Sequence, residues 1–147
     1  MACGAHAATT SRDMVTFVRD LYTSQIAAQA NDARVSDAAF DAVFSRNLRA
    51  LMRAPKVNMD RTPDGPMLNV FFGWGVPPKL ELKLDKVAPA HDATGASRLV
   101  RVEATVRGEK RQILVRPVRE DGAWRIADIN YGSGAGLVSH YRRITGR

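Results

Sequence analysis

The strongest evidence for the fold lies in residues 98–131, RLVRVEATVRGEKRQILVRPVREDGAWRIADINY. Apolar residues alternate with charged or polar ones from Arg98 to Arg107, which is the pattern of a half-buried β-strand. Gly108 and Glu109 fit a two-residue type II′ turn, because Gly stands at its first central position. This turn brings the apolar faces of both strands together, so we predict a β-hairpin here. The expected pairs are Arg107/Lys110, Ala104/Ile113, Val102/Val115, Val100/Pro117, Thr105/Gln112 and Arg101/Arg116.

A second hairpin follows directly. Asp121-Gly122 is typical of a type I′ loop, which pairs Glu120 with Ala123. The further pairs are Arg119/Trp124, Pro117/Ile126, Val115/Asp128 and Ile113/Asn130. This register places Asp128 and Asn130 on the apolar face of the sheet. A three-residue loop is the alternative, and it would turn both side chains outward.

Helices are predicted before the sheet. Ser11 is a suitable cap for a helix that ends at Ala30, and an apolar stripe runs along it. A second helix begins after Ser36, and its pattern continues to Pro55 as a third helix after a bend at Ser45. The stripe of the first helix is Met14, Phe17, Val18, Leu21 and Tyr22.

The stretch from Lys56 to Pro78 is rich in Pro and Gly and is predicted to be irregular. Inside it, residues 67–76 form an apolar run in which two glycines flank Trp74. Two interpretations are open: a plug under the helices, or a loop that closes over a pocket with Trp74 as its wall. Residues 80–85 alternate as another strand, residues 89–97 are expected to be a polar loop, and residues 137–144 a short helix.

The order of these elements predicts an α+β fold, in which N-terminal helices pack on a curved antiparallel sheet of about four strands. The chain has 147 residues, which suits one domain with a core of its own. We expect a flexible N-terminus over residues 1–11 and a single domain over residues 12–147. No apolar run is long enough to predict a transmembrane helix.

The net charge of +7 is concentrated near the end of the chain. Residues 98–147 hold 11 Lys+Arg and 5 Asp+Glu, so six of the seven net charges lie there. The outer face of the predicted sheet is therefore either a solvated surface or a basic surface for an anionic partner. Aromatic residues do not interleave with its cations, so we expect no nucleic-acid binding. The basic-face residues are Arg101, Arg107, Lys110 and Arg116.

The sequence offers little for metal or nucleophilic chemistry. Cys3 is the single cysteine, and His6, His91 and His140 are far apart, so we expect no metal site and no cofactor. The start of the chain has two interpretations. Ala-Cys-Gly around Cys3 is similar to the acylated cysteine of a bacterial lipoprotein after signal removal, and the alternative is an ordinary disordered N-terminus.

The run from Asp121 to Ile129, DGAWRIADI, resembles the final strands of the nuclear-transport-factor-2-like superfamily. Together with residues 17–22 and 48–51 it is more narrowly similar to a bacterial family of unknown function found in secreted proteins and lipoproteins. The resemblance covers roughly residues 12–143. It implies a cone-shaped, cystatin-like fold in which a curved sheet and helices enclose a cavity. Members of the superfamily that act as isomerases or hydratases carry an aspartate in this cavity, and Asp128 is the corresponding candidate.

Three functions follow as hypotheses. The first is a non-catalytic domain of the bacterial periplasm or envelope that binds a small apolar ligand or a protein, as a monomer or weak homodimer; a native N-terminus would instead favour the cytoplasm. The second is an isomerase or dehydratase with Asp128 as general base. The third is an immunity or assembly protein that acts through the basic face. The candidate ligand-binding residues are Tyr22, Trp74, Trp124, Asp128 and Asn130.

Overall fold

The computed structural model describes residues 3–30, 37–57, 68–74, 81–96, 98–132 and 136–147. Helices precede an open four-stranded antiparallel sheet, as predicted for the α+β class. The helices before the sheet are α1 (Cys3–Ala30), α2 (Asp37–Asp41) and α3 (Arg46–Arg53). The sheet consists of β3 (Leu82–Ala90), β4 (Leu99–Val106), β5 (Glu109–Glu120) and β6 (Ala123–Asn130), hydrogen-bonded in that order. A small hairpin of β1 (Leu68–Asn69) and β2 (Gly73–Trp74) precedes it, and α4 (Leu137–Thr145) follows it.

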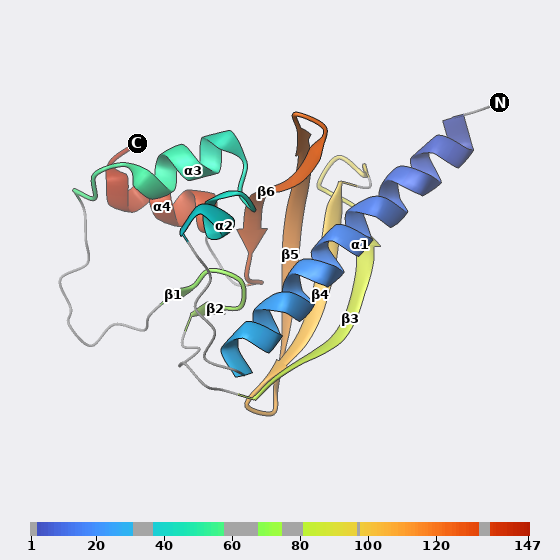
Figure 1. Ribbon diagram of the computed structural model, residues 1–147, viewed down its shortest axis with the longest axis horizontal. Helices are drawn as coiled ribbons and strands as arrows, with labels where there is room; N and C mark the ends of the chain where they lie inside the picture. The colour runs from blue at the N-terminus through green and yellow to red at the C-terminus, as the bar shows by residue number, and fades with distance from the viewer. Residues whose placement is uncertain (1–2, 31–36, 58–67, 75–80, 97, 133–135) are drawn as a thin grey trace.

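Helix α1 lies across one face of the sheet and contacts β3, β4 and β5 (Figure 1). We call this the inner face. Met14, Val18 and Tyr22 of α1 are buried against it, as the predicted stripe requires. The expected start at Ser11 is wrong, because α1 begins at Cys3. The alanines before Ser11 are strong helix formers, so the helix continues through them.

Helices α3 and α4 pack against each other beside β6, at the other end of the sheet (Figure 1). Ser45 confirms the predicted break before the third helix: its side chain accepts a hydrogen bond from the Leu48 backbone N–H, which makes it the N-cap of α3. The backbone beside it also closes the free edge of β6. Ser45 N–H donates to Ile126 O, and Ile126 N–H donates to Val43 O, each at 2.8 Å.

The first hairpin forms, but its predicted turn is one residue too late. The loop is Arg107-Gly108, and both residues have a positive φ, of 52° and 79°, as a type I′ turn requires. The pairs are therefore Val106/Glu109, Ala104/Arg111, Val102/Ile113 and Val100/Val115 rather than those expected. The register moves by two residues, so each side chain stays on its predicted face.

The second hairpin confirms the Asp121-Gly122 loop and the pairs from Glu120/Ala123 to Pro117/Ile126. The register then shifts, because Ala127 is an extra residue in β6. Asp128 lies opposite Arg116 and Ile129 opposite Val115. The predicted pairs Val115/Asp128 and Ile113/Asn130 are therefore wrong, and Ile129 takes the buried position.

Strand β3 is longer than the sequence predicts, since it continues through Pro89 and Ala90 into the expected polar loop. A proline is tolerated there because β3 pairs only with β4 and is an edge strand of the sheet. A register shift between Leu84 and Lys86 leaves Asp85 as a bulged residue. The expected C-terminal helix is confirmed as α4. None of the helices in the described ranges is long and apolar enough to span a membrane.

Candidate functional site

The inner face of the sheet is where a ligand cavity was expected, and Tyr22 is one of its predicted residues. The Tyr22 side chain is fully buried, and its hydroxyl donates a hydrogen bond of 2.7 Å to Phe71 O. Its ring meets those of Phe71 and Phe72 edge-on, with centroids 5.9 and 5.3 Å away. Burial raises the pKa of Tyr22 well above its ordinary value, and Tyr131 adds to this, so the hydroxyl stays a neutral donor.

The segment around Phe71 and Phe72 is held by three side chains from distant parts of the chain. Tyr22 binds Phe71 O, Arg111 Nη1 donates to Phe72 O at 3.1 Å, and the Tyr131 hydroxyl donates to Val70 O. From within the segment, Asn69 Oδ1 accepts from the backbone N–H groups of Phe71 and Phe72. Every carbonyl from Val70 to Phe72 is thus bonded to a side chain, so this turn is rigidly placed.

Phe72 is fully buried and Phe71 nearly so, and both belong to the core with Tyr22 and Phe44. Their rings occupy the interior that a ligand would need. The interpretation of this stretch as a plug is therefore confirmed for residues 69–73, and the alternative of a loop closing over a pocket is not supported there. The side chain of Trp74, predicted as a pocket wall, lies outside the described residues.

Trp124 is partly buried on the inner face at the start of β6. Its ring stacks on Phe17 of α1 with centroids 6.5 Å apart, and the Arg119 guanidinium lies 5.1 Å from the ring centroid. Its indole Nε1 is buried and has no hydrogen-bond partner in the described part of the chain. A buried donor without an acceptor is costly, which makes this N–H the most favourable point on the inner face for a bound acceptor.

Asp128 was expected on the apolar face, and this placement is wrong because of the bulge at Ala127. The carboxylate instead serves α4. Its Oδ1 accepts hydrogen bonds from the backbone N–H of Ile129 at 2.8 Å and of Val138 at 3.0 Å. Gly136, the N-cap residue of α4, has no side chain, so Asp128 supplies the capping oxygen from the neighbouring strand.

Gly136 is required by this arrangement. A Cβ added there would lie 2.9 Å from Ile129 O, which is too close for a side chain, and 3.3 Å from Asp128 Oδ1, which is a tight contact. The absence of a Cβ lets the start of α4 approach β6 closely enough for the Asp128 cap.

Asn130 is exposed, and its Oδ1 accepts from Gly132 N–H at 2.9 Å. The predicted ligand set is therefore not assembled: Asp128 binds the start of α4, Asn130 faces solvent, and Tyr22 holds Phe71. Periodicity could not reveal this, because one extra residue in a strand reverses the face of everything after it.

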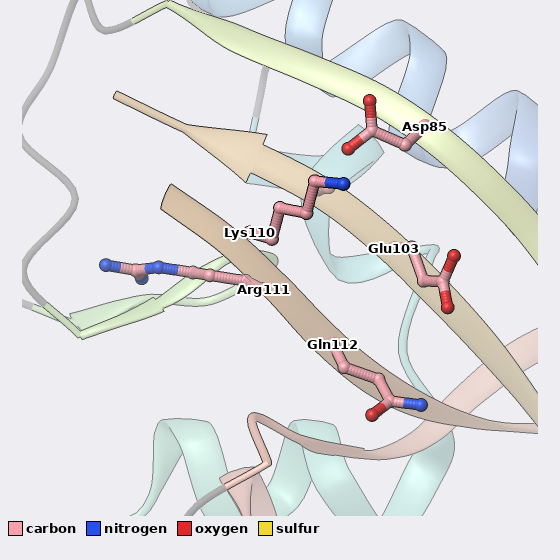
Figure 2. A pocket seen from close by; sticks show the side chains of 6 residues that line it. Asp85, Glu103, Lys110, Arg111 and Gln112 are labelled. Atoms are coloured by element: carbon pink, nitrogen blue, oxygen red, sulfur yellow. The ribbon is translucent and has the colours of Figure 1, made fainter. Parts of the chain in front are cut away.

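The outer face of the sheet carries a shallow depression of about 280 Å³. It spans β3, β4 and β5, and Figure 2 shows Asp85, Glu103, Lys110 and Gln112 around it, with Arg111 directed away toward the β1–β2 hairpin. The bulge in β3 presents Asp85, whose Oδ2 accepts from Thr105 Oγ1 at 2.5 Å. The alternation of residues 98–107 predicts Glu103 on the outer face, but no sequence pattern indicates that Asp85 and Glu103 belong to one site.

The predicted basic face is only partly basic. Arg101, Lys110 and Arg116 share the outer face, whereas Arg107 lies in the turn, where its backbone N–H donates to Glu81 O. The carboxylates of Asp85 and Glu103 stand among these cations. The two ion pairs within the described ranges, Arg46–Asp121 and Arg53–Asp41, lie elsewhere, so no ion pair among the described residues involves Arg101, Lys110 or Arg116.

The described residues hold no group of three or more His, Cys, Asp or Glu side chains that could bind a metal ion. His140 of α4 lies with Nδ1 3.4 Å from Arg143 Nη2, and burial together with the Arg143 charge lowers its pKa. His91 is exposed after β3.

Comparisons with protein-family models, with curated proteins and with solved structures each found no match.

Proposed function

We propose that this chain is a non-catalytic binding domain that recognises a protein partner with the outer face of its sheet. The observation that carries the proposal is that helix α1 covers the inner face, while the outer face of β3, β4 and β5 is hollowed and no helix of the described residues packs on it. Exposed strand faces with a specific charge pattern are suited to docking, because charged groups set both the encounter rate and the register.

The interior supports a protein partner over a small apolar ligand. Phe71 and Phe72 pack on Tyr22 of α1 in the core, and their carbonyl groups already accept hydrogen bonds from Tyr22 and Arg111. The unpaired Trp124 Nε1 is the single feature that favours a ligand on the inner side. Catalysis by Asp128 is not favoured, because its Oδ1 already accepts two backbone hydrogen bonds.

The charges of the outer face indicate an acidic partner surface. The cations of the outer face outnumber its carboxylates, those of Asp85 and Glu103. Because these two carboxylates lie among the cations, the partner would need hydrogen-bond donors or cations opposite them. Such a mixed pattern favours one docking geometry over others. The outer-face cations are Lys83, Lys86, Arg101, Lys110 and Arg116.

The place of action that we propose is the bacterial envelope, and it rests on the resemblance of residues 17–22, 48–51 and 121–129, taken together, to a bacterial family found in secreted proteins and lipoproteins. An immunity or assembly factor is the kind of protein that would act through such a face.

Photo-crosslinking tests the proposal. A crosslinking amino acid replaces Gln112 in the depression, and the matched control places it at Ser24, which is exposed on α1. In extracts of the source cell, we expect one protein to be captured from position 112 and not from position 24. Capture should weaken at high salt, because the contacts are between exposed charges.

The double variant Lys110→Glu/Arg116→Glu should lower capture about tenfold or more, as expected for loss of charge pairs across an interface. Arg12→Glu/Arg147→Glu makes the same change in net charge away from this face and should leave capture intact. Equal capture from positions 112 and 24 would refute the docking face. A small molecule retained by the purified protein in native mass spectrometry would favour the ligand-binding alternative instead.

A further inference from the structure

Helices α3 and α4 end side by side, and cations gather where they end. Val57, four residues after α3, donates its backbone N–H to Ile144 O near the end of α4 at 2.8 Å. Figure 1 shows the two helices next to each other, away from the strands that α1 covers. We call this surface the α3/α4 tip. Its residues are Arg53, Lys56, Val57, Arg142, Arg143 and Arg147.

All five cations of the α3/α4 tip are exposed. Cations near the C-terminal end of a helix offset the partial negative charge of its free carbonyls, and Lys56 Nζ indeed lies 3.5 Å from Met52 O. One or two cations per helix would meet this need. Arg147 lies beyond the end of α4, and together the five cations exceed what the helix ends require.

The charge of the α3/α4 tip has one sign, unlike that of the outer face. Residues 42–57 and 129–147, which contain both helices, hold seven Lys+Arg and no Asp or Glu. Among the ion pairs of the described residues, one reaches the tip, between Arg53 and Asp41. Lys56, Arg142 and Arg147 form none with a described carboxylate.

Val57 adds an apolar group to the same surface. It is 67% exposed and is the large hydrophobic residue that the described chain leaves most open to water. Its neighbours are Lys56 in sequence and Ile144 by the backbone hydrogen bond, so it lies where the two helices that carry these cations meet.

We propose that the α3/α4 tip binds the surface of an anionic phospholipid membrane, with the cations at the headgroup phosphates and Val57 dipping into the interface. This concerns a second surface and does not depend on partner binding by the outer face. Exposed cations and an exposed apolar residue at the same pair of helix ends fit a bilayer, where phosphate groups and hydrocarbon lie within a few ångströms of each other. Arginine, four of the five cations, suits phosphate oxygens because its guanidinium donates two parallel hydrogen bonds.

Nucleic acid shares the phosphate chemistry but explains less of this surface. An exposed valine finds no partner along a phosphodiester backbone. Single-strand binding also uses exposed aromatic rings for stacking, and the tip has none among its six residues. The bilayer therefore accounts for both Val57 and the cations.

Co-sedimentation with vesicles tests the proposal, using phosphatidylcholine with and without added phosphatidylglycerol at physiological salt. The full chain should bind the anionic vesicles and not the neutral ones. Each basic residue at an anionic surface is worth about fivefold in binding, so Lys56→Gln/Arg142→Gln/Arg147→Gln should weaken it roughly a hundredfold. Val57→Ser should weaken it about fivefold, through lost apolar contact.

The matched control is Lys83→Gln/Lys86→Gln/Lys110→Gln, which removes the same charge from the outer face and should change vesicle binding by less than about threefold. Equal losses in the two triple variants would mean that overall charge, not the tip, drives binding, and would overturn the proposal. So would equal binding to neutral vesicles. Tighter binding to a short duplex DNA than to the anionic vesicles, lost in the tip variant, would reassign the tip to nucleic acid. The circular-dichroism spectra of all variants should match, since every substituted side chain is exposed.

Discussion

The two faces of the same sheet differ in what their side chains do. On the inner face of β4, Val100, Val102 and Ala104 are fully buried, and the neighbouring strand β5 adds Ile113 and Val115. On the outer face the same strands carry charged and amide side chains around a shallow depression. The inner face forms the core and stabilises the fold. The outer face is therefore where the sheet can bind a partner without loss of stability.

The difference in stability effect between the two faces should be largest for a substitution at Phe72. Phe72→Ala should lower the free energy of unfolding by about 3–5 kcal/mol, because it empties a fully buried position next to the Tyr22 ring. Urea denaturation measures this. Gln112→Ala on the outer face is the control and should change stability by less than about 0.5 kcal/mol. Similar losses at both positions would remove the distinction between the faces.

Tyr22→Phe isolates one hydrogen bond of the inner face. The ring remains, but Phe71 O loses its buried donor, which should cost about 1–3 kcal/mol. The result that contradicts this account is an unchanged unfolding midpoint.

Tyr22 should also make the stability of the fold depend on pH in the alkaline range. Its folded pKa is raised, so the unfolded chain releases the Tyr22 proton first as pH rises. The contribution of neutral Tyr22 to the stability of the fold is complete below the unfolded tyrosine pKa of about 10. It is lost progressively as the pH rises from there toward the folded pKa. Thermal unfolding between neutral and strongly alkaline pH should therefore show a smaller decline for Tyr22→Phe than for the unchanged protein.

Asp128 is a polar residue of β6 whose side chain contributes to the stability of the fold, because it caps α4. Asp128→Ala should destabilise the fold by about 0.5–2 kcal/mol, as expected when a helix loses its cap. Asp128→Asn should cost less, since an amide oxygen can still accept from Val138. A loss in Asp128→Ala no larger than in Asp128→Asn would mean that the bond to Val138 contributes little.

Lys110→Ala has the smallest expected effect on stability, below about 0.5 kcal/mol, because the side chain is exposed and forms no ion pair with a described residue. Chemical denaturation checks this, and a larger loss would show that the outer face also supports the fold.

The candidate site could be predicted only in part. The outward direction of Arg101, Lys110 and Arg116 follows from strand alternation, and a two-residue register shift left it intact. The grouping of Asp85 with Lys110 could not be predicted, because it depends on a bulge in β3 and on which strands become neighbours. Asp128 was misplaced for the same kind of reason.

Features that depend on a few adjacent residues could be predicted from the amino-acid sequence alone. The Asp121-Gly122 loop follows from residues that tolerate positive φ, the Ser45 cap from a hydroxyl beside a helix start, and the strands and α1 stripe from hydrophobic period. Tertiary structure alone decided the bulge at Ala127, the filling of the interior by Phe72 and the meeting of the ends of α3 and α4. Each of these depends on contacts between residues far apart in the chain, such as those from Tyr22 to Phe71 and from Val57 to Ile144. The energies of such contacts cannot be predicted from the pattern of adjacent residues.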